Sequence, residues 1–308
     1  PYAHASTCHE QCERKKSVMT AGEHNRELVL QWGAATDIGP VRSENEDSWL
    51  AAPPFFAVAD GMGGHLGGAR ASRTAVQTLC EYLSEERLGD RAADLVDLSE
   101  AVEEAGERVN ALAGADDAQN APGTTLTGVL ALDTDEGPYW LSLNIGDSRV
   151  YVVGNGRISP ITHDHSAVQE ARDMAEELGT PQIIPPSNVV TKALGGGLTG
   201  SVSADYTLMP LCEGDYAVVC SDGIHGVLTD VQMCSIVTAG RGPQGVADHL
   251  VSAALSAGTR DNATAVVVYA ASASRLTSDP HAMTRVIQPV RPASTRTTRR
   301  TPLRKGSN

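Results

Sequence analysis

The sequence FFAVADG, at residues 55–61, joins an apolar run to an Asp-Gly pair, and YAVVCSDG, at residues 216–223, repeats the arrangement. A third carboxylate, Asp261, comes shortly before the apolar run at residues 265–269. Short apolar runs bounded by turn residues are typical of buried strands. We therefore expect all three acids to lie at strand ends. Hard divalent cations require oxygen ligands on a stiff scaffold, so the pattern predicts a metal site.

A single Asp-Gly pair is more simply explained as a turn. Three acids, each beside a strongly apolar strand, favour a shared site instead. The glycine after Asp60 also lets a backbone carbonyl or a ligand come close. Carboxylates that bridge two metal ions about 3.5–4 Å apart would activate a water molecule and bind phosphate oxygens.

Two further polar segments contain candidate residues. In the acidic loop at residues 37–48, Arg42 is a lone cation among four acids. A guanidinium binds phosphate through two hydrogen bonds and keeps its charge, which suits a phosphomonoester pocket, although a surface ion pair is the simpler explanation of Arg42 alone. At residues 144–149, Asp147 follows an apolar strand and precedes Arg149. A turn with a local salt bridge is the alternative there.

The order of the expected elements indicates the fold class. Apolar residues recur with helical spacing in five segments, and alternate or cluster as in strands elsewhere. The expected order is strands, two helices, many strands, further helices and a last strand. Because this order is not a βαβ alternation, we expect an α+β fold with mainly antiparallel sheets and helices on the outer faces. We expect strands at 28–34, 49–60, 124–132, 139–145, 150–153, 157–162, 189–194, 206–208, 216–220 and 265–269, and helices from residue 67 and over 95–112, 166–178, 231–237 and 246–255.

The charge distribution separates an acidic body from a basic tail. The net charge is −14; residues 275–308 contain eight Lys/Arg and one Asp, so residues 1–274 carry −21, from 16 basic and 37 acidic residues. An acidic body argues against nucleic-acid binding. Residues 1–27 and 273–308 are polar, and we expect a flexible arm and a disordered tail around a domain over 28–272. No secretory signal or long apolar run is present, so we expect a cytoplasmic protein without a transmembrane segment.

A set of short motifs resembles the bacterial branch of the type 2C protein phosphatases, the PPM family. The motifs occur in the family's order over roughly residues 30–270, and several are individually specific. They are Val41-Arg42 with Asn45-Glu46-Asp47, Val58-Ala59-Asp60-Gly61-Met62-Gly63-Gly64-His65, Gly123-Thr124-Thr125, Gly146-Asp147-Ser148-Arg149, Asp164-His165-Ser166, Thr191-Lys192-Ala193-Leu194-Gly195, Cys220-Ser221-Asp222-Gly223 and Asp261-Asn262-Ala263-Thr264.

This resemblance implies a four-layer αββα sandwich with a binuclear Mn²⁺ or Mg²⁺ centre. Asp60 would bridge the two ions, Asp222 and Asp261 would complete one, and the Gly61 carbonyl would complete the other. The remaining roles also follow from the family motifs. Glu46 and Asp47 would act on the second ion or its waters, Asp147 would help Asp222 to hold a weaker third ion, Arg42 would bind the substrate phosphate, and Asn262 would support Asp261.

The sequence departs from animal members of the family, which carry a histidine directly after the Asp-Gly pair, where Met62 stands here. The general acid is therefore unassigned. A metal-bound water is the economical candidate, and His65 and His163 are alternatives that structural roles explain more simply. The segment 163–188, called the flap below, corresponds to the part of the family that covers the site, and we expect it to influence substrate choice.

The resemblance implies hydrolysis of phosphoserine and phosphothreonine in proteins by a metal-bound hydroxide. The expected partners are phosphorylated proteins, together with a Ser/Thr kinase and its targets, and the expected state is a monomer. A pseudophosphatase would lack a metal ligand, whereas all the expected acids are present. A phosphoesterase for small molecules stays open, and turnover of a phosphopeptide compared with a nucleotide would distinguish the two.

Overall fold

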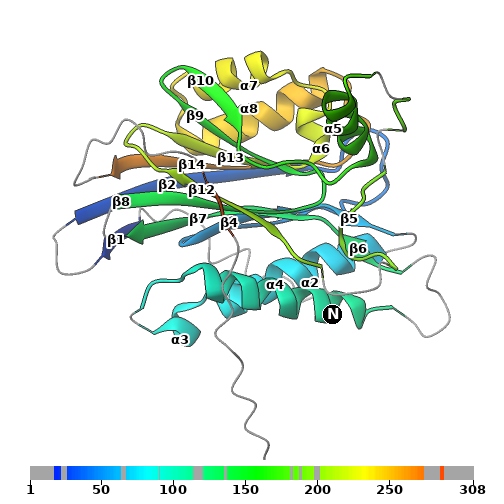
Figure 1. The fold of residues 1–308 in the computed structure, drawn as a ribbon. Coiled ribbons are helices and arrows are strands. Elements are labelled where there is room, and N and C mark those ends of the chain that lie inside the picture. Colours follow the sequence, from blue (N-terminus) through cyan, green and yellow to red (C-terminus); the bar gives the residue numbers. More distant parts are fainter. Residues whose placement is uncertain are drawn as a thin grey trace, which may run out of the picture.

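The computed structural model describes residues 17–21, 26–63, 67–89, 91–113, 121–134, 137–180, 183–186, 189–197, 202–273 and 285–287. Two six-stranded sheets pack face to face, with helices on both outer faces (Figure 1), which gives the expected four-layer α+β sandwich. Every strand pairing is antiparallel.

Sheet A has the order β1-β2-β14-β13-β9-β10, and sheet B has the order β15-β12-β8-β7-β4-β3. The strands of sheet A are β1 Ser17–Ala21, β2 Arg26–Asp37, β14 Ala263–Ala273, β13 Tyr216–Cys220, β9 Arg149–Gly154 and β10 Arg157–Pro160. The strands of sheet B are β15 Arg285–Ile287, β12 Asp205–Pro210, β8 Gly137–Ile145, β7 Leu126–Thr134, β4 Phe55–Ala59 and β3 Ser48–Ala52. A small third sheet contains β11 Leu194–Gly195, β6 Gly123–Thr124 and β5 Gly61–Met62.

The helices divide between the two outer faces. Those that pack on sheet B are α2 Gly67–Tyr82 and α4 Leu95–Asn110, and those that pack on sheet A are α6 Asp222–His225, α7 Asp230–Val237 and α8 Gly242–Ser256. Two further helices are α3 Glu85–Leu88 and α5 Ala167–Leu178. The described helices include none that is long and apolar enough to cross a membrane.

Alternation along the strands builds three apolar layers. In β14, Val266 and Val268 face the space between the sheets, whereas Val267 packs against the helices of sheet A. In β4, Phe56 joins the inner layer and Phe55 packs against α2 and α4. A strand places successive side chains on opposite faces, so runs that are apolar throughout can serve two layers at once.

Gly33 fixes how closely α8 approaches sheet A. A Cβ atom at Gly33 would lie 2.3 Å from the Cα of Gln244 in the first turn of α8. The Gln244 side chain then bonds the backbone of Ala34 on both sides, donating to its carbonyl at 2.9 Å and accepting from its N–H at 3.3 Å. The missing side chain at residue 33 therefore lets a helix backbone rest directly on the strand.

The structure differs from the sequence-based expectation at several places, and the short helices α3 and α6 were not expected. Residues 17–21 of the expected arm form β1, which pairs with β2, and residues 285–287 of the expected tail form β15, which pairs with β12. Both are short edge strands that are held by backbone pairing. Such strands show little hydrophobic pattern in the sequence. The expected strand over 189–194 reduces to a single bridge at Val190 and the two-residue β11. The domain boundaries at 28 and 272 stay a prediction, and the rest of the arm and tail lies outside the described residues.

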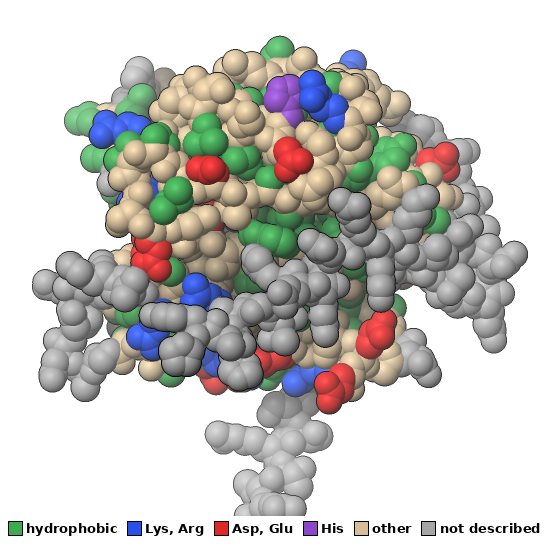
Figure 2. Space-filling model, turned by 180° about the vertical axis from the view of Figure 1, so that it is seen from behind, with side chains coloured by type: hydrophobic (Ala, Val, Ile, Leu, Met, Phe, Trp, Pro, Cys, Tyr) green, Lys and Arg blue, Asp and Glu red, His purple; other side chains and the backbone are tan. Residues whose placement is uncertain are grey.

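Seen from behind, the described surface carries basic and acidic side chains in small separate groups (Figure 2). Hydrophobic side chains are visible between them, in the middle of this face. The part of this face that the structure describes therefore offers no long continuous cationic surface of the kind that follows a nucleic-acid backbone.

Candidate metal centre

The predicted acids are brought together from both sheets. Asp60 directly follows β4 of sheet B, Asp222 begins α6 directly after β13 of sheet A, and Asp261 lies two residues before β14. The side chains of Asp222 and Asp60 contact each other, and Asp261 acts electrostatically on both. The Asp-Gly pair at 222–223 opens a short helix, whereas a turn was the simpler explanation from sequence.

Two threonines fix the backbone of Asp60. Its N–H donates to the Thr125 hydroxyl at 2.9 Å, and its carbonyl accepts from the Thr125 N–H and the Thr124 hydroxyl, both at 2.9 Å. Because the main chain is fully bonded, the carboxylate is the group of Asp60 that is left for a ligand.

Gly61 is required by close backbone packing. A Cβ atom there would lie 2.3 Å from the carbonyl oxygen of Gly68 and 2.6 Å from that of Glu46. The Gly61 N–H donates to the Glu46 carbonyl at 3.2 Å. The loop that carries Glu46 and Asp47 therefore lies directly against the Asp-Gly pair.

Asn262 attaches the acidic loop to β14. Its side-chain amide donates to the carbonyls of Ile38 at 2.9 Å and Glu44 at 3.0 Å, and its oxygen accepts from the Glu46 N–H at 2.8 Å. The expected support of Asp261 is confined to the backbone, since the Asn262 N–H donates to Asp261 Oδ1 at 2.9 Å. Asn262 thus positions Glu46 as well as Asp261.

Asp47 joins the two sheets through one of its oxygens. Asp47 Oδ2 accepts from Ser221 Oγ at 2.8 Å and Thr264 Oγ1 at 2.6 Å, both from sheet A segments. Asp47 Oδ1 is buried without a hydrogen-bond partner, and so is Asp222 Oδ1. A buried carboxylate oxygen without a partner is costly unless a cation compensates it. These two oxygens therefore fit a hard divalent ion.

The pKa values of the clustered acids indicate the same deficit of positive charge. Burial, followed by neighbouring carboxylates, raises the pKa of Asp60 well above its usual value and also raises that of Asp222. Burial raises the pKa of Asp47 to about 7, although its hydrogen bonds act in the opposite direction. Burial and the charge of Asp222 raise the pKa of Asp147 to about 7. Burial likewise raises the pKa of Glu46. Carboxylates this close favour either protons or a bound cation.

Arg42 pairs with Asp261 in this structure. Its guanidinium donates to Asp261 Oδ2, and the side chain of Arg42 is 49% exposed. The hydrogen bond to Asp261 is also the main cause that raises the pKa of Arg42. Among the described residues, no three acidic, imidazole or thiol groups already converge closely enough to chelate one ion. Arg42 and a metal ion would compete for Asp261 Oδ2.

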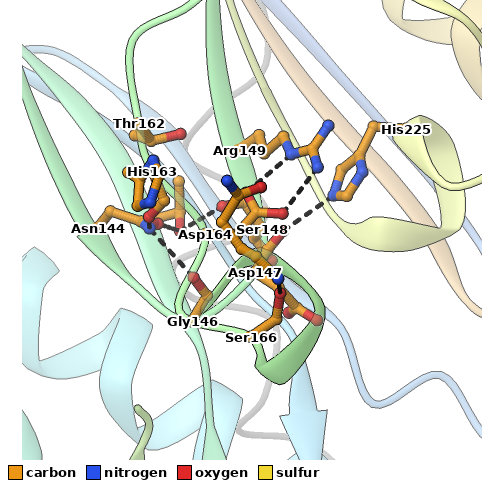
Figure 3. Close-up of polar contacts among 12 residues, drawn as sticks. Asn144, Gly146, Asp147, Ser148, Arg149, Thr162, His163, Asp164, Ser166 and His225 are labelled. Atoms are coloured by element: carbon orange, nitrogen blue, oxygen red, sulfur yellow. Dashed lines mark hydrogen bonds and ion pairs between the residues drawn. The ribbon is translucent and has the colours of Figure 1, made fainter. Parts of the chain in front are cut away.

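Asp147 lies in a loop that its neighbours hold on several sides (Figure 3). The His225 Nε2–H donates to the Asp147 carbonyl at 2.9 Å, and burial lowers the pKa of His225 to about 4, so the imidazole is neutral. Arg149 makes its salt bridge with Asp164, through two hydrogen bonds of 2.8 and 2.7 Å. His225 was not predicted, although its position three residues after Asp222, on the same helical turn, is the signal that could have identified it.

The two alternative general acids have different outcomes. His163 is 60% exposed and pairs with Asp173 at 2.7 Å within the flap, which fits the simpler structural explanation. His65 lies outside the described residues.

The fold and the site together define an α+β sandwich with a candidate divalent-metal centre. The family model described as Protein phosphatase 2C matches residues 42–239, and the chain belongs to this family. The chain is 32% identical over 244 residues to the serine/threonine protein phosphatase PstP of Mycobacterium tuberculosis, covering 78% of this chain and 45% of that protein. It therefore spans less than half the length of that relative.

One further relative and the crystallised catalytic domain of PstP are matched over nearly their full length. The serine/threonine phosphatase stp of Listeria welshimeri is 30% identical over 240 residues, which cover 76% of this chain and 93% of that protein. The crystal structure of the PstP catalytic domain in complex with two manganese ions has a TM-score of 0.65 and 30% identity, covering 79% of this chain and 98% of that one.

Proposed function

We propose that this chain removes phosphate from phosphoserine and phosphothreonine in proteins with the help of two Mn²⁺ or Mg²⁺ ions. The observation that carries the proposal is the pair of buried, unpartnered oxygens on Asp47 and Asp222 within a cluster of acids whose pKa values are raised. The family relatives named as serine/threonine phosphatases, and the PstP domain with two manganese ions, support the substrate class and the number of ions.

The proposed ligands are those expected from the sequence. Asp60, Asp222, Asp261 and the Gly61 carbonyl would hold the two ions, with Glu46 and Asp47 beside them, and Asp147 with Asp222 would hold a weaker third. When bound, such ions lower the pKa of coordinated water and neutralise phosphate oxygens.

The chain's own residues supply position and charge. Thr124 and Thr125 fix the backbone of Asp60, and Asn262 holds the loop of Glu46 against β14. Arg42, exposed beside Asp261, would turn to the phosphate and form charge-assisted hydrogen bonds with its oxygens as negative charge develops. Ser221 and Thr264 keep Asp47 aimed at the cluster.

The test is hydrolysis of a phosphothreonine peptide with Mn²⁺, with EDTA, and by Asp222→Asn in Mn²⁺. We expect turnover that requires Mn²⁺ and is lost in Asp222→Asn, while Asp173→Asn, which alters an exposed acid of the flap, stays active. No turnover by folded protein that has bound Mn²⁺ would refute the proposal, and turnover of a nucleotide in preference to the peptide would favour a small-molecule phosphoesterase. A kinase as partner, a monomeric state and a cytoplasmic location are further parts of this proposal. Size measurements would check the monomeric state, and cell fractionation would check the location.

A further inference from the structure

The two ends of the flap meet beside His165. Ser166 and Val190 form an isolated antiparallel bridge where the flap leaves and rejoins the body. The Ala167 N–H donates to the Val189 carbonyl, and the Thr191 N–H donates to the His165 carbonyl, both at 2.9 Å. His165 therefore lies beside the returning chain as well as at the start of the flap.

All four polar groups of His165 are bonded. Besides its carbonyl, its backbone N–H donates to the Gly146 carbonyl at 2.8 Å, and its Nδ1 accepts from the Gly146 N–H at 3.1 Å. Its Nε2 contacts Asp205 Oδ2 of β12 at 3.0 Å. The side chain is only 11% exposed. One mostly buried side chain and its backbone thus join the flap, the loop that carries Asp147, and sheet B.

These contacts fix the tautomer of the imidazole. The Gly146 N–H can only donate, so Nδ1 is the acceptor and the proton lies on Nε2, which donates to Asp205. Burial lowers the pKa of His165 and so favours the neutral ring, although the contact with Asp205 acts in the opposite direction. Lys192 donates to the other oxygen of Asp205 at 3.0 Å. The chain on both sides of the flap is therefore connected through one carboxylate.

Gly146 controls the direction of Asp147. Its φ of 108° is reserved in practice for glycine, and a Cβ atom there would lie 2.5 Å from Thr125 Cγ2. Asn144 donates to the Gly146 carbonyl at 3.1 Å and to the His163 carbonyl at 2.7 Å (Figure 3). The peptide before Asp147 is thus held from both sides, and the Asp147 carboxylate lies close enough to Asp222 to respond to its charge.

We propose that His165 is a positioning residue that holds the Gly146 peptide so that Asp147 faces the acid cluster, and that couples this loop to the flap through Asp205 and Thr191. The inference rests on the proposed function only for its effect on Mn²⁺ binding. The contacts of Gly146 and Asp205 are a property of the fold, and they can be measured without any reaction.

Two substitutions separate the two contacts of the ring. In His165→Asn, the side-chain oxygen can replace Nδ1 as the acceptor for Gly146 but cannot reach Asp205. In His165→Gln, the side-chain amide can replace Nε2 as the donor to Asp205 but leaves the Gly146 N–H without an acceptor. His163→Gln is the matched control, because His163 is two residues away and makes its side-chain contact with Asp173.

The first readout is hydrogen exchange of the amides at residues 146–148 in EDTA. We expect about tenfold faster exchange in His165→Gln, as the loss of one hydrogen bond implies. We expect a smaller increase in His165→Asn, whose side chain has lost the support of Asp205, and near wild-type exchange in His163→Gln. The second readout is Mn²⁺ binding followed by electron paramagnetic resonance, with Asp147→Asn defining the part that depends on Asp147. We expect that part to weaken about tenfold in His165→Gln, as for other residues that orient metal ligands.

Wild-type exchange at 146–148 in His165→Gln, or the same change in His163→Gln, would overturn the proposal. If His165→Gln does not fold, Asp205→Ala tests the same coupling. Asp205 is 48% exposed, and its replacement removes the contact with the His165 ring without changing Gly146. Faster exchange at 146–148 in Asp205→Ala is then expected, and unchanged exchange would refute the coupling. If the variants show the expected differences in exchange but the wild-type protein has no phosphatase activity, the proposed function alone is refuted.

Discussion

The guanidinium of Arg42 donates a hydrogen bond to the carboxylate of Asp261, a residue 219 positions later in the chain. The residue proposed to bind phosphate and a residue proposed to bind metal thus neutralise each other. An exposed pair of this kind contributes little stability. The pair therefore matters more for competition at Asp261 than for the fold.

Arg42→Ala separates these two effects. We expect Mn²⁺ to bind the variant at least as tightly as the wild type, because Asp261 has lost its competing cation. We expect kcat/KM for a phosphothreonine peptide to fall about 100-fold, the usual cost of removing a donor to developing negative charge. Calorimetric titration with Mn²⁺ and steady-state kinetics would measure both. Arg91→Ala, which removes a similar pair with Asp97, is the control, and weaker Mn²⁺ binding by Arg42→Ala would contradict the interpretation.

Asp60→Asn should stabilise the protein in EDTA while abolishing turnover. The buried carboxylate lies among four other acids that raise its pKa, so its removal relieves repulsion. A carboxylate whose folded pKa is raised is unfavourable in its charged form, so we expect a gain in the free energy of unfolding at pH 8. Urea denaturation in EDTA would measure it, with Asp173→Asn as the control. A destabilised Asp60→Asn would mean that the carboxylate is compensated by contacts within the protein.

The stability in EDTA should fall as the pH rises from about 4 to about 7. The folded pKa values of Asp47 and Asp147 are raised to about 7 from 3.8, so the folded state binds more protons in this interval and loses stability as the pH increases. His225 acts in the opposite direction, because its lowered pKa of about 4 reduces stability as the pH falls below 6.5. We expect the acids to dominate because several are raised together. Thermal unfolding from pH 4 to 8 would test this, and added Mn²⁺ should flatten the profile.

Asn262→Ala should destabilise the loop that carries Glu46. Three hydrogen bonds are lost, and the Glu46 N–H and the Ile38 and Glu44 carbonyls lose their partner. We expect a loss of about 1–3 kcal/mol in the free energy of unfolding and weaker Mn²⁺ binding. Asn110→Ala, at the exposed end of α4, is the control and should change neither quantity. An Asn262→Ala protein with wild-type stability would show that water replaces the side chain.

Gly33→Ala should destabilise the contact between β2 and α8. The added Cβ atom would lie 2.3 Å from a helix backbone atom, so α8 must move. Overpacking of this kind costs about 1–3 kcal/mol. Gly106→Ala is the matched control, because a Cβ atom there meets only a leucine methyl at 3.4 Å within α4 and alanine favours the helix. Chemical denaturation of both variants would decide, and equal stabilities would contradict the packing argument.

The strands and the acids at their ends could be predicted from sequence because each depends on a local pattern. β4, β13 and β14 are apolar throughout and end or begin beside an acid, so Asp60, Asp222 and Asp261 could be placed without a structure. The long helices α2 and α4 follow the same logic, since their buried residues recur with helical spacing.

The contacts between the motifs could not be predicted in this way. His165 acts through the backbone of Gly146, and nothing in its neighbouring residues signals such a partner. His225 acts through the backbone of Asp147, and its spacing from Asp222 indicates its place near the acids but not this partner. A local salt bridge of Arg149 was the alternative explanation of this segment, but its partner Asp164 lies 15 residues later. The order of β1 and β15 comes from pairing at sheet edges, which the side chains of those short segments do not encode.

The place of β14 in sheet A has a consequence for biosynthesis. This strand is among the last described segments of the chain, yet it lies between β2 and β13 in the interior of the sheet. A nascent chain that ends before residue 261 has β2 and β13 but nothing to join them, and it also lacks Asp261, the partner of Arg42. Premature termination before that point would therefore yield an aggregation-prone polypeptide without one of the proposed metal ligands, rather than a shortened form of the folded domain.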